Sequence, residues 1–379
     1  MSVKAAVARG AFALAERGVV ADGVARVGIR RLVRSRLRSL ADGSGLDLST
    51  LRRGPIAPAP AEANEQHYEV PAEFFRIVLG PWRKYSSGYW PSPSTTFEQS
   101  ETEMLELTCR RALLEDGQRV LDLGCGWGAF SLFAAQRYPD SRFTAVSHSR
   151  SQRAFIEAEA LLLGLENLEV VTRDVNDLVL TRESLDRVVS IEMFEHMSNY
   201  ERLFERITRW LRPDGALFVH VFCHHDRPYR FEDDGPGAWM AREFFTGGMM
   251  PSRDLLPHFA GELTLESDWF VDGTHYARTA NAWLARLDER RDEVRSVLAA
   301  TYGEAETDRR LERWRLFFLA VAETFGYAGG TEWGVAHHRF RKPRGADGPG
   351  GSVAPLTGQM ARHPDRPPAT ETALRPIRT

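Results

Sequence analysis

The chain has 379 residues, of which 43% are hydrophobic, so it is long enough for one large α/β domain with additions. A net charge of −3 gives no overall basic surface, and we therefore expect no nucleic-acid partner. The three cysteines, Cys109, Cys125 and Cys223, form no CxxC pair, which argues against a disulfide framework and is typical of a reducing, cytoplasmic location. No window comes near eighteen uninterrupted apolar residues, so we predict neither a membrane-spanning helix nor a secretory signal.

The two ends of the chain differ in composition from its middle. Residues 1–53 are predicted to form a helical region, and the Gly, Pro and Ala-rich residues 54–64 a linker. A compact domain is expected over 65–342, followed by a disordered tail over 343–379. Basic residues crowd the first region at Arg30, Arg31, Arg34, Arg36 and Arg38. They fit a solvated helix face, or a surface that contacts anionic lipid or a partner.

Inside the compact domain, short β-rich runs alternate with helical stretches, a pattern that predicts βαβ units and a parallel sheet. The predicted strands are 119–123, 143–147, 168–172, 187–191 and 217–222, with two later runs at 263–270 and 333–341. The predicted helices between them are 131–137, 151–163 and 200–211. A turn is expected at 212–215, the sequence RPDG, before the fifth strand.

The strongest local signal is RVLDLGCGWGAFS at 119–131, in which a strand ends in Asp122 and is followed by Gly124, Gly126 and Gly128. Glycines let the backbone turn sharply and approach a ligand, and the next helix offers free N–H groups. The spacing also satisfies G-x-G-x-x-A, a dinucleotide pattern. That site would need an acidic residue at the end of the second strand, where this chain has Ser147. The acid before the glycines instead resembles the first motif of S-adenosylmethionine methyltransferases.

Beyond this loop, about residues 64–341 resemble the family that joins cyclopropane fatty acid synthases to coclaurine-type N-methyltransferases. The segments that carry the resemblance are ANEQHYEVPAEFF, KYSSGYW, VSHSRSQ, SIEMFEHMSNY, LFVHVFCHH, FFTGGMMPS and WRLFFLAVAETFGYAGG. The FFTGGMMPS and WRLFFLAVAETFGY stretches are closer to the N-methyltransferase branch. The resemblance implies a Rossmann-like, seven-stranded class I methyltransferase fold with an N-terminal helical extension and S-adenosylmethionine as cofactor.

The resemblance also implies a shell of cofactor-binding residues at or after the predicted strand ends, where open α/β sheets bind ligands. Besides Asp122, this shell has Tyr85 and Ser86 at the methionine end, Gly124 and Gly126 beneath it, Ser147, His148 and Gln152 at the ribose, Asp174 and Val175 at the adenine, and Ile191 beside the methyl group. The cofactor carries an ammonium, a carboxylate, a diol and an amine, and each needs a polar partner.

A second cluster, Glu192, Glu195 and His196, follows the fourth predicted strand. The two acids alone fit an ordinary helix start, but the added histidine favours a working site. An amine acceptor must be neutral to attack, so a nearby base is useful. In the coclaurine-type branch the matching positions have that role. We therefore expect Glu195 and His196 to act as acid/base groups and Glu192 to attract a cationic substrate.

In the cyclopropane branch, a bound bicarbonate is thought to remove a proton, and its matching positions here are Ser87, Glu195, His220 and Tyr276. Three of them keep their polar type. Ser87 stands where that branch carries cysteine, which puts cyclopropanation in doubt without excluding it, since serine still donates a hydrogen bond.

The histidines at 220, 224 and 225 lack HExxH or comparable spacing, and we predict no metal site. Residues 223–253 form a long insertion rich in aromatics and glycines, which fits a lid over the acceptor or plain packing.

Three hypotheses remain from the sequence. The first is N-methylation of a small cyclic or aromatic amine. The second is transfer of a methylene or methyl to an unsaturated phospholipid acyl chain, with at most peripheral membrane contact. The third is a non-catalytic cofactor-binding module. The sequence leaves the acceptor and the oligomeric state open.

Overall fold

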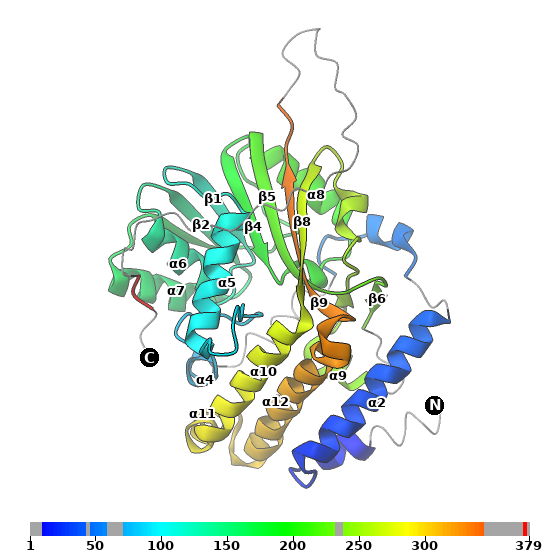
Figure 1. Cartoon of the computed structure of the whole chain (residues 1–379). Coiled ribbons are helices and arrows are strands. Elements are labelled where there is room, and N and C mark those ends of the chain that lie inside the picture. The colour runs from blue at the N-terminus through cyan, green and yellow to red at the C-terminus, as the bar shows by residue number, and fades with distance from the viewer. Residues whose placement is uncertain (1–9, 43–45, 59–70, 232–237, 345–373, 377–379) are drawn as a thin grey trace.

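The computed structural model describes residues 10–42, 46–58, 71–231, 238–344 and 374–376, and its centre is a seven-stranded sheet (Figure 1). Its strands are β1 (Arg119–Leu123), β2 (Arg142–Ser147), β3 (Leu168–Thr172), β4 (Leu185–Ile191), β5 (Leu211–His224), β8 (Thr264–Asp272) and β9 (Trp333–Arg341). Their order is β3-β2-β1-β4-β5-β9-β8, and β9 runs antiparallel to both of its neighbours. All seven predicted strands are present, and the Rossmann-like, seven-stranded α/β fold is confirmed.

Helices cover both faces of the sheet because strand side chains alternate between two apolar layers. On one face lie α5 (Phe97–Arg111), α6 (Ala129–Arg137) and α7 (Arg150–Leu163), packed with strand residues such as Val120 and Ala145. On the other lie α8 (Tyr200–Trp210), η1 (Leu48–Arg52) and η3 (Leu256–Phe259), packed with residues such as Leu121 and Val146. The parallel strands of the central sheet therefore end at one shared edge.

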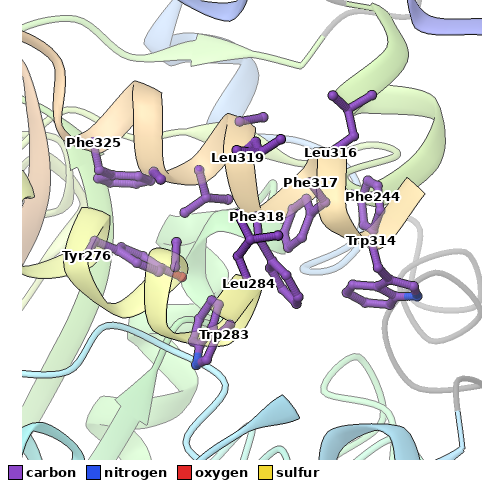
Figure 2. Packing of buried hydrophobic residues seen from close by; sticks show 14 of the residues in the cluster. Phe244, Tyr276, Trp283, Leu284, Trp314, Leu316, Phe317, Phe318, Leu319 and Phe325 are labelled. Carbon is purple, nitrogen blue, oxygen red and sulfur yellow. The ribbon is translucent and has the colours of Figure 1, made fainter. Parts of the chain in front are cut away.

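At this carboxyl edge the chain adds a helical layer, seen below the sheet in Figure 1. It consists of α4 (Ala72–Val78), α10 (Gly273–Glu289), α11 (Arg291–Tyr302), α12 (Glu304–Phe325) and, from the N-terminus, α2 (Asp22–Ala41). Buried aromatic side chains from several of these elements hold the layer together (Figure 2). Phe244 stacks on Phe317 with ring centroids 4.1 Å apart, and Trp283 packs against Phe318 at 5.6 Å.

The N-terminal region is part of this layer. Buried Ile29 and Val33 join α2 to the helical core, and Arg26 and Arg30 bind the carboxylate of Glu323 in α12. Among the basic residues singled out above, Arg30 is thus ion-paired, and Arg36 lies over the Tyr229 ring at 5.0 Å. Arg31, Arg34 and Arg38 are exposed. Within the described ranges, no helix is both long and apolar enough to cross a bilayer.

The predicted linker is described only as far as residue 58, and there it packs against the domain. Ile56 and Ala57 are buried, and their N–H groups donate to Asn176 Oδ1. These residues therefore do not form a free spacer. Residues 59–64 of the predicted linker, and 345–373 and 377–379 of the predicted tail, lie outside the described residues.

Two further predictions concern the second half of the chain. The turn expected at 212–215 lies inside β5, which begins at Leu211 and contains an irregularity with Asp214 in the left-handed region (φ 63°). The 223–253 segment forms β6 (Tyr229–Arg230), α9 (Ala238–Phe244) and β7 (Met249–Met250). Its aromatic side chains at 229, 239 and 244 are buried in the helical core, so they contribute to packing whatever else they do.

The junction between β8 and α10 depends on a glycine. A Cβ at Gly273 would lie 2.1 Å from the carbonyl oxygens of Phe325 and Trp333. We expect Gly273→Ala to lower the free energy of unfolding by about 1–3 kcal/mol, because the backbone must shift. Gly28→Ala is the control, since nothing lies within 4 Å of its position and alanine is the better helix former by about 1 kcal/mol. Urea unfolding of both variants measures the difference, and equal midpoints would contradict the close approach.

Candidate active site

The glycine loop connects β1 to α6 at the carboxyl edge of the sheet. Gly124, Gly126 and Gly128 all have positive φ, at 87°, 52° and 80°, which other residues adopt only with strain. The N–H groups of Gly124 and Cys125 donate to the carbonyl of Val146 in β2, which fixes the start of the loop. A Cβ at Gly126 would meet nothing within 4 Å, so this part of the loop faces open space.

A cavity beside the loop brings together six of the eleven residues predicted to bind the cofactor. These are Tyr85, Ser86, Asp122, Gly124, Gly126 and Ile191, and Glu192 joins them. Asp122 is buried and accepts a 2.5 Å hydrogen bond from the Ser131 hydroxyl, and burial raises its pKa to about 7.

Two buried cations that the sequence analysis missed, Arg83 and Lys84, line the same cavity. Lys84 Nζ donates to Ser86 Oγ and, at 2.6 Å, to the carbonyl of Ser87. Burial lowers the pKa of Lys84 to about 8. A cavity that holds both cations and an acid has the charges that the zwitterionic methionine end of S-adenosylmethionine requires.

The five residues predicted for the ribose and adenine lie at the same edge but do not line this cavity. The Ser147 hydroxyl donates to Gln152 Oε1 at 2.6 Å, and His148 is exposed. Asp174 Oδ1 accepts from the N–H of residue 176, and the Val175 carbonyl accepts from Arg206. Buried Gln152 Nε2 has no hydrogen-bond partner in the part of the chain that the structure describes, which leaves a donor for a ligand.

Glu192 is the centre of the acidic cluster. It follows β4 directly, and its N–H donates to the carbonyl of His220 at 2.8 Å. Its carboxylate accepts from the Tyr276 hydroxyl at 2.7 Å and from the Ser87 N–H at 3.3 Å, and it lies 3.2 Å from His220 Nε2. Glu192 has φ 47°, a conformation that costs a non-glycine residue about 1–3 kcal/mol and persists where the surroundings impose it.

Glu195 and His196 lie in the short helix η2 (Phe194–His196), and neither lines the cavity beside the glycine loop. Glu195 is 1% exposed, and its Oε2 has no hydrogen-bond partner among the described residues. Burial, and then the charge of Glu192, raise the pKa of Glu195 well above its usual value. Burial lowers the pKa of His196 to about 4, and its ring stacks on Phe245 at 5.9 Å.

Three of the four residues implied for bicarbonate are hydrogen-bonded to Glu192. The sequence placed Glu195 with Ser87, His220 and Tyr276, but in the structure the Glu192 carboxylate makes the hydrogen bonds to those three residues.

A second cavity, almost entirely apolar, lies between the helical layer and the 223–253 segment. Its domain side includes Phe222, Phe231, Phe245, Tyr276 and Phe325, and its other wall comes from the N-terminal region through Phe12, Ile29 and Val33. Tyr276 therefore borders this cavity while its hydroxyl binds Glu192, which borders the first cavity.

The two histidines that were considered as metal ligands besides His220 make local hydrogen bonds at the end of β5. His224 Nδ1 accepts from the N–H groups of Asp226 and Arg227 at 3.0 Å, and His225 bonds to Asp226. In the described parts of the chain, no three His, Cys, Asp or Glu side chains are placed to hold a metal ion.

Comparison with known proteins agrees with the geometry. Residues 58–328 match the family described as mycolic acid cyclopropane synthetase. The chain belongs to this family. A relative among curated proteins is the (S)-coclaurine N-methyltransferase of Thalictrum flavum subsp. glaucum, 38% identical over 77% of this chain and 82% of the relative. The cyclopropane-fatty-acyl-phospholipid synthase of Escherichia coli strain K12 is 31% identical over 59% of this chain and 56% of that protein.

Among solved structures, a coclaurine N-methyltransferase bound to N-methylheliamine and SAH superposes with a TM-score of 0.84 at 35% identity, covering 89% of this chain and all of that one. The cyclopropane synthase MmaA2 of Mycobacterium tuberculosis shares the fold, with a TM-score of 0.62 at 24% identity over 76% of this chain and 99% of that one. The family member described here is thus an S-adenosylmethionine-dependent methyltransferase.

The tight packing of Gly124 provides a test of the cofactor cavity. A Cβ there would lie 2.7 Å from Met193 Cγ in the segment that carries the acidic cluster. We expect Gly124→Ala to weaken S-adenosylhomocysteine binding by at least about tenfold, equivalent to 1.4 kcal/mol, because the loop must move. Gly117→Ala is the matched control: its φ of 82° carries the same backbone strain, but no atom lies within 4 Å and the site is distant. Calorimetric titration of both variants with S-adenosylhomocysteine measures the difference. Equal losses of affinity would contradict the assignment of this cavity to the cofactor.

Proposed function

We propose that the enzyme transfers the methyl group of S-adenosylmethionine to the nitrogen of a small cyclic or aromatic amine. One observation carries this proposal, the hydrogen bond between Tyr276 and Glu192. It joins a charged cavity suited to the cofactor with an aromatic cavity suited to an apolar acceptor. A carboxylate at the junction of the two is placed to attract a cation, and a protonated amine is one.

The aromatic cavity supports a flat, apolar acceptor. Phe222, Phe231 and Phe245 offer faces and edges to a ring system, and aromatic contacts of this kind favour aromatic or cyclic ligands. Several relatives are named for such acceptors, among them coclaurine, pavine and tetrahydroprotoberberine N-methyltransferases. We propose that the N-terminal region and the 223–253 insertion serve as the walls of this cavity, and that the enzyme acts in the cytoplasm.

The proposed cofactor shell keeps the residues expected from the sequence and adds the buried cation Lys84. Its members are Tyr85, Ser86, Asp122, Gly124, Gly126 and Ile191 in the cavity, with Ser147, His148 and Gln152 toward the ribose and Asp174 and Val175 toward the adenine. When bound, S-adenosylmethionine supplies an electrophilic methyl group on a positively charged sulfur.

We assign a different role to each of the three residues in the acidic cluster. Glu195 is a buried carboxyl whose raised pKa suits it to accept a proton from the bound ammonium, which frees the nitrogen lone pair for attack. His196, kept neutral by burial, is the second acid/base group. Glu192, held by three donors, stabilises the positive charge between the two cavities. A site with these acid/base groups argues against the third hypothesis, a non-catalytic cofactor-binding module.

The rival reading, modification of unsaturated lipid acyl chains, has less support in this chain. A bicarbonate ion would need the donors of Ser87, His220 and Tyr276, and the Glu192 carboxylate already accepts hydrogen bonds from these residues. We infer that this enzyme uses its own carboxylate where the lipid branch uses an external anion.

The central test follows label from isotopically marked S-adenosylmethionine, by mass spectrometry, in parallel on cyclic amines and on monounsaturated phospholipid vesicles. We expect a labelled methyl on the amine, with kcat lowered at least about 100-fold in Glu195→Gln because the base is lost. In the wild type the rate should fall as the pH drops through the raised pKa of Glu195, and the variant should lose this dependence. If the acyl chain instead gained a labelled methylene or methyl group, the enzyme would belong with the lipid-modifying branch.

The role of Glu192 is tested by chemical rescue. Glu192→Gly removes the carboxylate and the strained φ together, and leaves the three donors without an acceptor. We expect amine methylation to fall by about tenfold or more, as for a lost hydrogen-bonded charge, and added formate or bicarbonate to restore part of it saturably. Glu192→Gln fills the same space and should not respond. An unchanged circular-dichroism spectrum verifies folding. Equal responses of both variants to formate would refute the role of Glu192 as the charge that these three donors hold.

A further inference from the structure

A buried chain of hydrogen bonds extends from Glu192 away from both cavities. His220 Nδ1 lies 2.9 Å from Nε2 of His337, and His337 Nδ1 lies 2.7 Å from a terminal nitrogen of Arg111. Both histidines have no exposed surface. This hydrogen-bonded relay consists of Arg111, His337, His220 and Glu192. Neither the expected site nor the mechanism above uses Arg111 or His337.

The direction of every hydrogen bond in this chain follows from its two ends. A guanidinium has only donors, so His337 Nδ1 must accept and His337, when neutral, carries its proton on Nε2. That N–H donates to His220 Nδ1, which leaves the His220 proton on Nε2, facing Glu192 Oε1. Burial lowers the pKa of His220 to about 4 and that of His337 well below its usual value, so both rings are neutral at physiological pH.

We propose that Arg111 and His337 are positioning residues, which fix His220 as the Nε2–H tautomer so that it donates to the Glu192 carboxylate. This inference rests on the proposed function only in giving Glu192 its role at the junction of the two cavities. In the other tautomer, His220 would present a lone pair to a carboxylate oxygen, and the two acceptors would repel each other.

The sheet supplies the geometry that the relay needs. His220 and His337 are directly opposite each other in the antiparallel pairing of β5 with β9, so their side chains lie on the same face. Arg111 is the last residue of α5, which packs on that face, and its guanidinium also lies 4.7 Å from the Trp269 ring in β8. Three separate elements therefore hold the outer end of the relay in one place.

The relay orients groups and does not conduct protons. Arginine does not release its proton in proteins, so no proton can leave through Arg111. His220, whose two nitrogens are both engaged, is not available to take the proton of the acceptor amine. This leaves that task to Glu195 and His196, in agreement with the division of work proposed above.

The test compares variants that break or preserve the direction of the relay. His337→Phe removes both nitrogens. His337→Gln keeps an acceptor toward Arg111 and a donor toward His220 on one amide. We expect His337→Phe to lower kcat for amine methylation about 10- to 100-fold, the range typical for loss of a group that orients a functional imidazole. The KM for S-adenosylmethionine should stay within about twofold, since none of the residues that line the cofactor cavity is replaced. His337→Gln should recover most of the rate.

A spectroscopic readout separates positioning from packing and needs no acceptor. Long-range ¹H–¹⁵N correlation of the histidine rings in the full-length protein reports each tautomer, and His220 is assigned by the signal lost in His220→Asn. We expect the Nε2–H form in the wild type and in His337→Gln, and a shift away from it in His337→Phe and in the more accessible Arg111→Met.

Two results would overturn the proposal. One is a Nδ1–H tautomer of His220 in the wild type, and the other is equal activity of His337→Phe and His337→Gln. Because the tautomer is measured without an amine, failure to find any methylated amine would refute the proposed function while leaving the relay to be decided by the spectra.

Discussion

The structure depends on how one carboxylate, that of Glu192, is accommodated at the end of β4. A carboxylate in a largely buried site is costly unless hydrogen bonds replace its water, and each bond to a charged group contributes about 1.5–3 kcal/mol. Here the donors come from the segment before α5, from β5 and from α10. These elements are distant in sequence, so the carboxylate is satisfied only when the sheet and the helical layer are docked.

The same docking creates the aromatic cavity that we propose for the acceptor. Helices α10 and α12 bury their aromatic faces against each other and against α9, which fixes the helical layer as one body (Figure 2). Tyr276 belongs to this body but directs its hydroxyl toward the sheet. Helix α2 then closes the outer side, anchored by the ion pairs of Arg26 and Arg30 with Glu323. Residues that the sequence offered as a basic lipid-binding face thus contribute in part to the wall of a cavity.

The sequence predicted the positions of helices and strands better than it predicted the contacts between them. Strand positions followed from short β-rich runs between helical patterns, and the seven runs match the seven strands within a few residues, except that β5 begins six residues early. The cofactor loop was visible because its glycines are needed locally. The partner of His220 was not, because the register that sets His337 opposite it joins residues 117 apart. The three hydrogen bonds to Glu192 were not visible either, because they join residues 28 to 105 positions apart.

The two carboxyl groups of the EMFEH motif illustrate how one short segment can hold two opposite chemical roles. Glu192 accepts hydrogen bonds from donors of three separate elements. Glu195, three residues later, is buried with one oxygen unsatisfied by any described residue, and the negative charge of Glu192 further raises its pKa. In the proposed mechanism, the charge that attracts a cationic acceptor is therefore also the charge that makes its neighbour a better base. Pairs of acids with such divergent environments are characteristic of acid/base sites. The relay that we propose behind His220 fits this arrangement, because it would maintain the donor that faces Glu192.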